Sequence, residues 1–305
     1  MVCPVCDNSD LRPFQGQNGF NIQAAFGVPI LECSDCNFIF ADFIHPQVID
    51  YYYTHMCRSG STPEEFNRLR QNARVGGRSQ LMTMEPYLPS RIGRVLDFGG
   101  GSGEAARLFL PIGDEVFITE KDPHCIDHIM EEPRLQIIDG DDLMHEKYIG
   151  FFDLVIFSNV LEHMTYPAQR IQEFSRILSE GGQLFVEIPN EASYLRLSGK
   201  HCLQHISFFS LETFRKLIKK QGSFEIDDLR TCGPKIVDMV EAGELLHDFE
   251  AQDTPNGWVI RAMLRNIRPN TEIIQSGLRM DEVDATLSNL SQTIFLMNQV
   301  STCQV

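Results

Sequence analysis

Asp97 ends an apolar run, and four of the five residues in 99–103 are glycine. Glycine tolerates positive φ angles and leaves room for a ligand against the backbone, so such a turn can offer its N–H groups to a cofactor. We expect a helix over 103–110 to add the donors of its N-terminus. The spacing of Gly101 and Gly103 also fits a loose dinucleotide fingerprint. The turn therefore predicts a nucleotide-type cofactor without choosing which one.

Two acids follow later apolar runs at the spacing of an adenosine site. Glu120 closes the run 115–119, about twenty residues after the turn, where an acid commonly binds the ribose hydroxyls of a nucleotide. Asp141 follows the run 135–138, and its carboxylate could accept a hydrogen bond from the exocyclic amine of adenine. The alternative for Asp141 is the N-cap of a short helix, and one residue could fill both roles.

Four of the nine cysteines form two pairs, Cys3 with Cys6 and Cys33 with Cys36. In a chain without an export signal, two C-x-x-C turns favour tetrahedral zinc over disulfides. The zinc would be structural, because four thiolates leave no coordination position open for water. The alternative is a pair of reduced turns without an ion. The other cysteines stand alone, as is typical of small buried apolar residues.

Alternating strand and helix patterns must position the turn and the acids. Short apolar runs predict strands, and periodic apolar positions between them predict helices. The expected strands are 94–98, 115–119, 135–138, 152–157 and 183–188, and the expected helices are 103–110, 123–131, about 142–148 and 167–179. This βαβ order predicts an α/β fold with a doubly wound, mostly parallel sheet, which binds ligands at the carboxyl ends of its strands.

A helix and two strands follow these units. Ser210 and Gly222 stand where a helix over 211–221 would need its N-cap and its stop. Apolar runs at 224–230 and 257–264 predict an antiparallel pair that closes the edge of the sheet.

The chain divides into four segments. We expect a zinc-ribbon-like cysteine module at 1–45, a helical connector at 46–91, the cofactor-binding domain at 92–266 and a C-terminal helical extension at 267–305. The extension carries one apolar seam, formed by Val283, Leu287, Leu290, Ile294 and Met297. The seam can dock onto its own domain or pair with a second copy in a homodimer.

Composition and charge exclude several classes of function. The 305 residues are 43% hydrophobic, which suffices for one main domain with small appendages. A formal net charge of −16 argues against nucleic acid as a partner, because phosphate backbones are bound by clustered Lys and Arg. We see neither an apolar run of transmembrane length nor an export leader, so we expect a cytoplasmic protein without a membrane partner.

The fourth and fifth expected strands carry further motifs. Segment 152–164 reads FDLVIFSNVLEHM, and segment 178–190 reads LSEGGQLFVEIPN. With the glycine turn, these segments resemble the motifs of class I S-adenosylmethionine-dependent methyltransferases over about residues 92–265. The resemblance implies a Rossmann-like sheet and S-adenosylmethionine as the cofactor.

The resemblance also implies roles for single residues. The methionine part of the cofactor would be wrapped by loop glycines, with an acid beneath them and a serine near the amino-acid moiety: Gly99, Gly101, Gly103, Asp97 and Ser158. Glu120 would hold the ribose, and Asp141 would face adenine.

The N-terminal cysteine pairs resemble those of zinc-ribbon methyltransferases that act on nucleotide-linked sugars or polysaccharide precursors. This resemblance implies a small, sugar-containing substrate that is methylated on a hydroxyl or an amine. Carbon-methylating members carry a Glu-His pair before an aromatic-Phe-Ser segment. Here Gln204 precedes His205, and the chain lacks the large C-terminal domain of those enzymes, so carbon methylation is not expected.

Methyl transfer to a hydroxyl benefits from a base with a pKa near neutrality, which histidine provides. His205 lies in the segment 190–210, which we expect to roof the substrate pocket, and we assign it as the general base. Its alternative role is to fix the loop by hydrogen bonds. His163 is the second candidate, with packing beneath the cofactor as its alternative.

Two rival functions stay open. A nicotinamide-dependent oxidoreductase fits the glycine turn, but no residues are arranged for hydride transfer. A non-catalytic cofactor-binding or scaffold protein would keep the fold without a catalytic base.

Overall fold

The computed structural model describes residues 1–16, 27–44, 46–58, 60–202, 204–242 and 253–268. The apolar seam expected at 283–297 lies outside these residues. Among the described helices, none is both long and apolar enough to cross a membrane.

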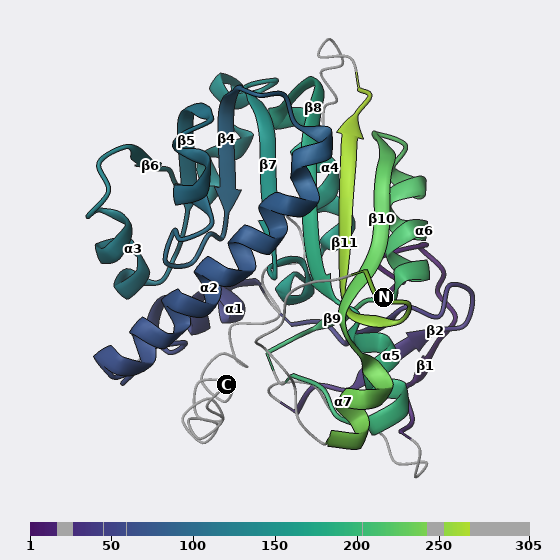
Figure 1. Cartoon of the computed structure of the whole chain (residues 1–305). Helices are drawn as coiled ribbons and strands as arrows, with labels where there is room; N and C mark the ends of the chain where they lie inside the picture. Colours follow the sequence, from purple (N-terminus) through teal and green to yellow (C-terminus); the bar gives the residue numbers. More distant parts are fainter. Residues whose placement is uncertain (17–26, 45, 59, 203, 243–252, 269–305) are drawn as a thin grey trace.

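A seven-stranded sheet, in the order β10-β11-β8-β7-β4-β5-β6, forms the centre of the molecule (Figure 1). Its strands are β4 (Ile92–Phe98), β5 (Gly113–Thr119), β6 (Leu135–Ile137), β7 (Phe152–Ser158), β8 (Leu178–Pro189), β10 (Phe224–Lys235) and β11 (Gly257–Asn266). Strands β4 to β8 are mutually parallel, whereas β11 runs antiparallel to both β8 and β10. The predicted mostly parallel, doubly wound sheet with an antiparallel closing strand is confirmed.

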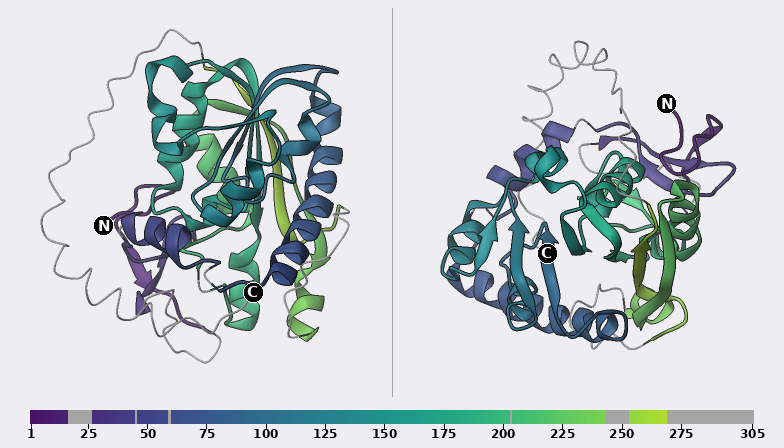
Figure 2. Two further views of the ribbon diagram at one scale, coloured as in Figure 1. Left: turned by 90° about the vertical axis from the view of Figure 1, so that its left-hand side faces the viewer. Right: turned by 90° about the horizontal axis from the view of Figure 1, so that it is seen from above.

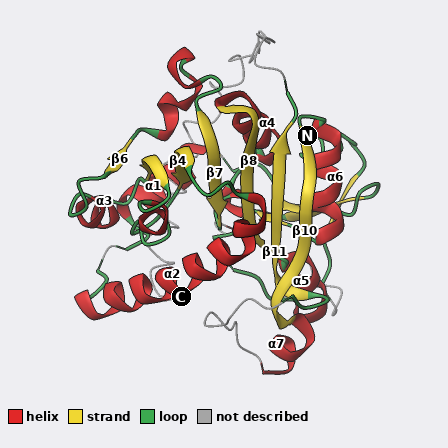
Figure 3. Ribbon diagram, turned by 45° about the horizontal axis from the view of Figure 1, so that its top comes forward, coloured by secondary structure: helices red, strands yellow, loops and turns green. Residues whose placement is uncertain are grey.

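Helices cover both faces of this sheet (Figures 2 and 3). The described α-helices are α1 (Pro46–His55), α2 (Pro63–Met84), α3 (Pro123–Ile129), α4 (Pro167–Ile177), α5 (Glu191–Ser198), α6 (Leu211–Gln221) and α7 (Ile236–Ala242). Met84 of α2 and Ile129 of α3 belong to one apolar cluster with the sheet. Phe174 of α4 and Phe214 of α6 belong to another. The sheet is thus buried on both sides, which explains why its strands read as continuous apolar runs.

Local capping residues define the ends of two helices. Thr62 and Glu65 form a capping box before α2, with Pro63 at the first helical position. Ser210 caps α6, and Gly222 ends that helix in the left-handed conformation with φ of 64°. The predicted helix 211–221 is confirmed with both of its boundaries, because its signals lie within the helix ends themselves.

A second sheet of four strands contains the cysteine turns. It has the order β1-β2-β3-β9, with β1 (Leu11–Pro13), β2 (Ile30–Cys33) and β3 (Ile39–Ala41) from the N-terminal segment. The fourth strand, β9 (Ser207–Phe208), comes from the segment after β8 and pairs antiparallel with β3. Figure 2 shows this N-terminal part on the side of the central sheet opposite α2.

Three predicted elements differ from the observed ones. The expected helix 103–110 is only a short 3₁₀ helix, Ala106–Phe109, flanked by turns, and Gly103 lies outside it with φ of 76°. The expected helix at 142–148 is two 3₁₀ helices, Gly140–Met144 and Glu146–Tyr148, separated by an extended His145. Strand β8 begins before its glycine pair and takes an irregular register there.

The segment expected to connect the cysteine module to the sheet is helical. It contains α1, α2 and the 3₁₀ helix Glu85–Tyr87. The helix α2 ends at Met84, within the expected connector 46–91.

Candidate cofactor and acceptor site

A cavity of about 810 Å³ lies at the carboxyl edge of the parallel strands. One part of its wall comes from the ends of β4, β5 and β6, including Gly99, Glu120 and Asp141. Another part comes from α1 and from the segment after β7, including Tyr53 and His163. The two parts enclose one space, so a ligand on the strand ends and a second ligand beside His163 can lie next to each other.

The loop after β4 has the backbone shape of a ligand cradle. Gly99 and Gly101 have φ of 68° and 55°. A Cβ on Gly99 would lie 2.7 Å from the side chain of Val160, whereas a Cβ on Gly101 would meet no protein atom within 4 Å among the described residues. The open space beside Gly101 belongs to the cavity, which Gly101 lines. The loop therefore leaves room where a cofactor would rest.

Glu120 connects this loop to the end of β5. Its Oε2 accepts a hydrogen bond of 2.8 Å from Gly101 N, and its Oε1 accepts from Lys121 N and Asp122 N at 2.7 and 2.9 Å. The carboxylate is thus oriented by backbone donors while it lines the cavity. A ribose diol placed there would find an acceptor already fixed.

Asp141 is exposed at the cavity wall and is not a helix cap. The N-cap is Asp139, whose Oδ1 accepts 2.9 Å from the N–H of Asp141. The carboxylate of Asp141 therefore stays available for a ligand in the cavity.

Asp97 lies beneath the loop and is buried. Its Oδ2 has no hydrogen-bond partner within the described residues, and a Cβ on Gly100 would approach that oxygen to 2.6 Å. Burial raises the pKa of Asp97 to about 7, with a further contribution from the charge of Glu120. An unpartnered acceptor below an open glycine loop fits a cofactor with a cationic amino-acid group, such as S-adenosylmethionine.

Two residues expected to bind the cofactor, Ser158 and Gly103, are not among the described residues that line the cavity. The Ser158 hydroxyl accepts 2.8 Å from Gln80 Nε2 and donates 3.2 Å to Glu187 Oε1. Its neighbour Asn159, in the left-handed region with φ of 53°, lines the cavity instead. Ser158 thus faces a buried polar cluster that the sequence did not reveal.

His163 and His205 lie against each other, with ring centroids 4.8 Å apart. Only His163 is among the residues that line the described cavity. Its Nδ1 lies 3.1 Å from the carbonyl oxygen of Gln204, so Nδ1 carries the proton and Nε2 is free to accept. His205 is buried behind it, with Nδ1 hydrogen-bonded to Glu191. Direct access to an acceptor therefore belongs to His163.

Two buried carboxylates surround the histidines. Burial raises the pKa of Glu162 to about 7, against the opposing effect of His205. Burial also acts to lower the pKa of His205, but the charges of Glu191 and Glu162 and the hydrogen bonds to Glu191 and Cys202 outweigh it and hold that pKa well above its usual range. Burial and the charge of His205 lower the pKa of His163 to about 3. Near neutral pH, His163 is therefore neutral and His205 is charged.

The sequence predicts no role for Glu162, whereas Glu191 lies with Tyr194 and His201 in the segment 190–210 as a further catalytic candidate. Both glutamates are almost fully buried. Glu162 stands next to His163 in the chain, and that adjacency was visible. Its proximity to His205 depends on how the segment 190–210 folds back, which no local pattern encodes.

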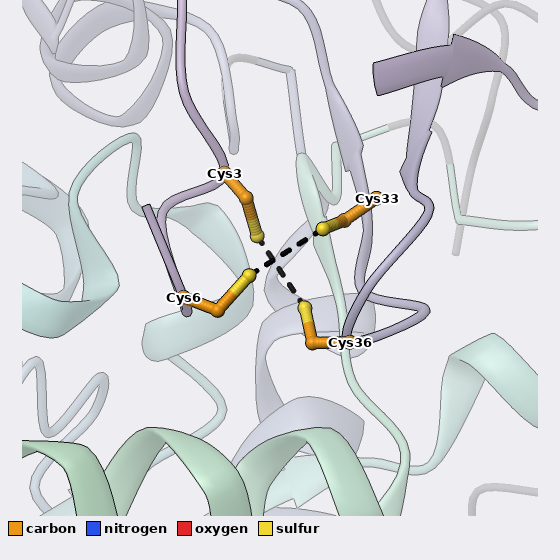
Figure 4. Close-up of side chains that lie close together, drawn as sticks. All are labelled: Cys3, Cys6, Cys33 and Cys36. Atoms are coloured by element: carbon orange, nitrogen blue, oxygen red, sulfur yellow. Dashed lines mark hydrogen bonds between the residues drawn. The ribbon is translucent and has the colours of Figure 1, made fainter. Parts of the chain in front are cut away.

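The four expected zinc ligands come together in the N-terminal module (Figure 4). Sγ of Cys3 lies 3.5 Å from Sγ of Cys36, and Sγ of Cys6 lies 3.4 Å from Sγ of Cys33, with all four pointing to a common centre. A disulfide would need a distance of about 2.05 Å. A tetrahedral zinc ion with Zn–S bonds of about 2.3 Å separates its sulfurs by roughly 3.8 Å. The cluster thus fits an ion better than disulfides.

Comparisons with known proteins agree with this geometry. The profile of a family described as "Methyltransferase domain" matches residues 65–227. An uncharacterized protein of Methanocaldococcus jannaschii is 26% identical over 192 residues, which cover 59% of this chain and 89% of that protein.

One solved structure shares the fold, and another is less similar. A S-adenosylmethionine-dependent methyltransferase from Thermotoga maritima has a TM-score of 0.52 at 19% identity, over 72% of this chain and 100% of that one. The N-methyltransferase NodS of Bradyrhizobium japonicum, solved with S-adenosyl-L-homocysteine, has a TM-score of 0.44 at 15% identity, over 73% of this chain and 98% of that one. Because the family profile covers more than half of the sequence, the chain belongs to the methyltransferase domain family and is a class I S-adenosylmethionine-dependent methyltransferase.

Proposed function

We propose that the enzyme methylates a hydroxyl or an amine of a small, sugar-containing molecule. The observation that carries this proposal is the single cavity that joins the glycine loop to the wall containing His163. The sugar is suggested by the N-terminal cysteine cluster, which resembles that of methyltransferases for nucleotide-linked sugars and polysaccharide precursors.

The charges of the cavity favour an acceptor group that is neutral or cationic. Three Lys and Arg side chains belong to its described wall, and each is paired with an acid. The charged atoms of Arg58 and Asp122 are 2.9 Å apart, those of Lys121 and Asp50 are 2.8 Å apart, and those of Arg170 and Glu173 are 2.8 Å apart. Asp50 and Glu173 are also part of the wall. Each Lys and Arg of the described wall is therefore paired with a carboxylate. A phosphate would have to displace one of these carboxylates. We infer that the sugar enters the cavity and that any nucleotide part stays outside it.

The cofactor would be held by residues from the strand ends. We propose that the loop glycines Gly99 and Gly101 surround its methionine part, with Asp97 beneath them, and that Gly103 shapes the loop through its positive φ of 76°. Glu120 would accept from the ribose hydroxyls, and Asp141 would accept from adenine. Ser158 would act through Asn159, whose Nδ2 donates to it at 3.1 Å.

When bound, S-adenosylmethionine supplies a methyl group on a sulfonium, and the electron pair of the broken S–C bond stays on sulfur. The protein must place the acceptor atom in line with that bond and exclude water. His163 lies where its free Nε2 can contact the acceptor, while Gln204 fixes the ring through Nδ1. We propose that His163 touches the substrate and that His205 positions it from behind, although the sequence alone favoured His205 as the base.

We also propose that Cys3, Cys6, Cys33 and Cys36 bind a structural zinc ion. Their segment contributes three short strands, and metal binding would supply the stability that so little apolar content does not.

Release of S-adenosylhomocysteine tests the function directly. The enzyme would be incubated with S-adenosylmethionine and a panel of simple glycosides, amino sugars and nucleotide sugars. We expect turnover with at least one sugar, and no inhibition by a free nucleoside diphosphate. Tight cofactor binding without turnover on any sugar would favour the non-catalytic alternative, and turnover on a sugar-free molecule would reject the sugar.

A further inference from the structure

Glu162, His163 and His205 bring three metal-binding atoms to one place beside the cavity. One donor atom from each residue lies within 4.8 Å of the others. Glu162 Oε1 is 3.9 Å from Nε2 of His163 and 3.9 Å from Nε2 of His205. These separations are too long for hydrogen bonds. Three ligand atoms bound to one ion at about 2.0–2.2 Å lie roughly 3.0–3.8 Å apart, so these side chains would have to close by only a few tenths of an ångström around a central ion.

The outer nitrogen of each histidine already has the partner that a metal ligand needs. Metal-binding histidines almost always donate their second N–H to a carboxylate or a carbonyl oxygen, which fixes the ring. His205 is hydrogen-bonded through Nδ1 to Glu191, and Nδ1 of His163 lies 3.1 Å from the Gln204 carbonyl oxygen. Both Nε2 atoms are consequently turned toward Glu162. Glu191 is itself fixed, since its Oε1 accepts 2.6 Å from Cys202 N.

The carboxylate of Glu162 is the second observation that points to a ligand. Its side chain is 2% exposed, and its Oε2 has no hydrogen-bond partner in the described part of the chain. Leaving a carboxylate oxygen buried and unpaired is costly. A cation between the three side chains would remove that cost.

We propose that Glu162, His163 and His205 bind one divalent transition-metal ion at the acceptor side of the cavity. Two imidazoles and one carboxylate suit zinc, iron, cobalt or manganese, and they are distinct from the soft thiolates of the N-terminal cluster. Three protein ligands leave coordination positions open, as in catalytic metal sites. His163 lines the cavity, so an open position can receive an oxygen or nitrogen of the acceptor.

The proposal rests on the proposed function in one respect, which is that the acceptor occupies this side of the cavity. The metal would hold the acceptor and lower the pKa of its hydroxyl, so that the proton leaves to solvent before the O–CH₃ bond forms. With the ion bound, Nε2 of His163 would reach the acceptor through the metal and not directly. The charged His205 would release its Nε2 proton to solvent when the ion binds.

Cobalt binding tests the site without an assay of activity. The full chain would be prepared with zinc on its cysteines, cleared of free metal and titrated with Co²⁺ in a calorimeter and a visible spectrometer. We expect one Co²⁺ per chain with a spectrum that lacks cobalt–thiolate charge transfer. Binding should weaken at least tenfold in Glu162→Gln and in His205→Asn.

Two further variants separate ligands from neighbours. Glu191→Gln changes only the partner of His205, and we expect it to weaken Co²⁺ by about 10–100-fold. Glu173→Gln is the matched control, because Glu173 lines the same cavity but lies outside the ligand group, and it should bind Co²⁺ like the wild type. Thermal unfolding and S-adenosylhomocysteine binding of each variant show that it is folded.

The outcomes distinguish the metal from the function. The metal site would be rejected if the chain bound no Co²⁺ outside the cysteine cluster, or if Glu162→Gln bound Co²⁺ as tightly as the wild type. Either result would reject the site even if sugars are methylated. If the wild type bound one Co²⁺ that Glu162→Gln did not bind, and no sugar were methylated, the metal site would stand and the proposed substrate would be rejected.

Discussion

At the scale of single residues, Asp97 differs most from an ordinary acid. It is buried without a partner for Oδ2, and its pKa is raised to about 7 by burial and by Glu120. The folded chain holds a proton there that the unfolded chain, with a pKa of about 3.9, has lost. Stability therefore falls as the pH rises between these two values.

We expect Asp97→Asn to remove this pH dependence. The free energy of unfolding of the wild type should fall by a few kcal/mol between about pH 4 and pH 7 because of Asp97, whereas the neutral amide has no charge to bury. Urea unfolding at several pH values measures both slopes. The same change at Asp114, whose side chain is 48% exposed, is the control and should leave the slope as it is. Equal slopes in wild type and Asp97→Asn would show that Asp97 is ionised in the fold.

Glu120→Gln should weaken S-adenosylhomocysteine binding by about 1.5–3 kcal/mol, the range for a lost charge-assisted hydrogen bond. The amide keeps the size of the side chain but has one acceptor oxygen for the three backbone N–H groups that Glu120 serves, so thermal unfolding of the variant checks that the loop is retained. Calorimetry gives the affinity. Glu115→Gln lies on the same strand outside the cavity wall and should bind normally. A normal affinity in Glu120→Gln would place the ribose elsewhere.

Part of the site could be predicted because its residues follow strand ends. Gly99 and Glu120 come directly after an apolar run and Asp141 follows one by three residues, and parallel strands bring such positions to one edge. The surroundings of Glu162 could not be predicted in this way. They depend on a segment that folds back from beyond β8, and its position is set by tertiary packing.

At the scale of elements, a buried ion pair joins α2 to the sheet. Arg261 of β11 lies beside its register partner Glu187 of β8, with Nε donating 2.6 Å to Oε2. The same guanidinium donates to Thr83 Oγ1 at 2.8 Å, and Gln80 donates to Glu187 at 2.7 Å. The pair thus fixes the connector helix against the strands.

We expect Arg261→Met to destabilise the protein by about 3–5 kcal/mol, because it leaves the buried carboxylate of Glu187 without its cation. Chemical denaturation measures the loss. The double change with Glu187→Met should recover most of it, since no unpaired charge remains. Arg91→Met breaks an exposed pair with Asp114 and should cost under about 1 kcal/mol. A loss as small as that in Arg261→Met would contradict the role of the pair.

The predicted ends of helices and strands agree with the observed ends where a capping residue or an apolar run marks them within the element itself. The caps of α6 and the apolar runs of β4, β5 and β7 gave nearly the observed ranges. The helix expected at 103–110 was wrong, since its apolar spacing is equally compatible with the turns and the 3₁₀ helix Ala106–Phe109 that the segment forms. The two-residue strand β9 carries too little pattern to be predicted at all.

At the scale of the whole molecule, the two sheets are connected through the segment that contains His205. Strand β9 begins two residues after His205 and pairs with β3, which follows the second cysteine pair. The cysteine cluster also packs in the same apolar cluster as α4 and α6. Loss of metal from the cysteines should therefore reach the acceptor side of the cavity.

Cys33→Ser should lower the zinc content below one ion per chain and reduce the thermal stability of the protein. Cys33 is buried and supplies one of the four sulfurs, so its loss leaves an incomplete site. Metal analysis by mass spectrometry and thermal unfolding measure both effects. Cys232→Ser, at a buried cysteine outside the cluster, should keep one zinc. Less than about a tenth of an equivalent in the wild type would rule out the structural zinc.

The pairing of β3 with β9 also sets the order in which a growing chain can finish its fold. The cysteines are made first, but their sheet keeps β3 as an open edge until Ser207 and Phe208 have been made. By then β4 to β8 exist, and the central sheet still awaits its last two strands. An open edge invites pairing with another chain. The part that is synthesised first is thus completed late, and a ribosome that pauses before β9 would expose it.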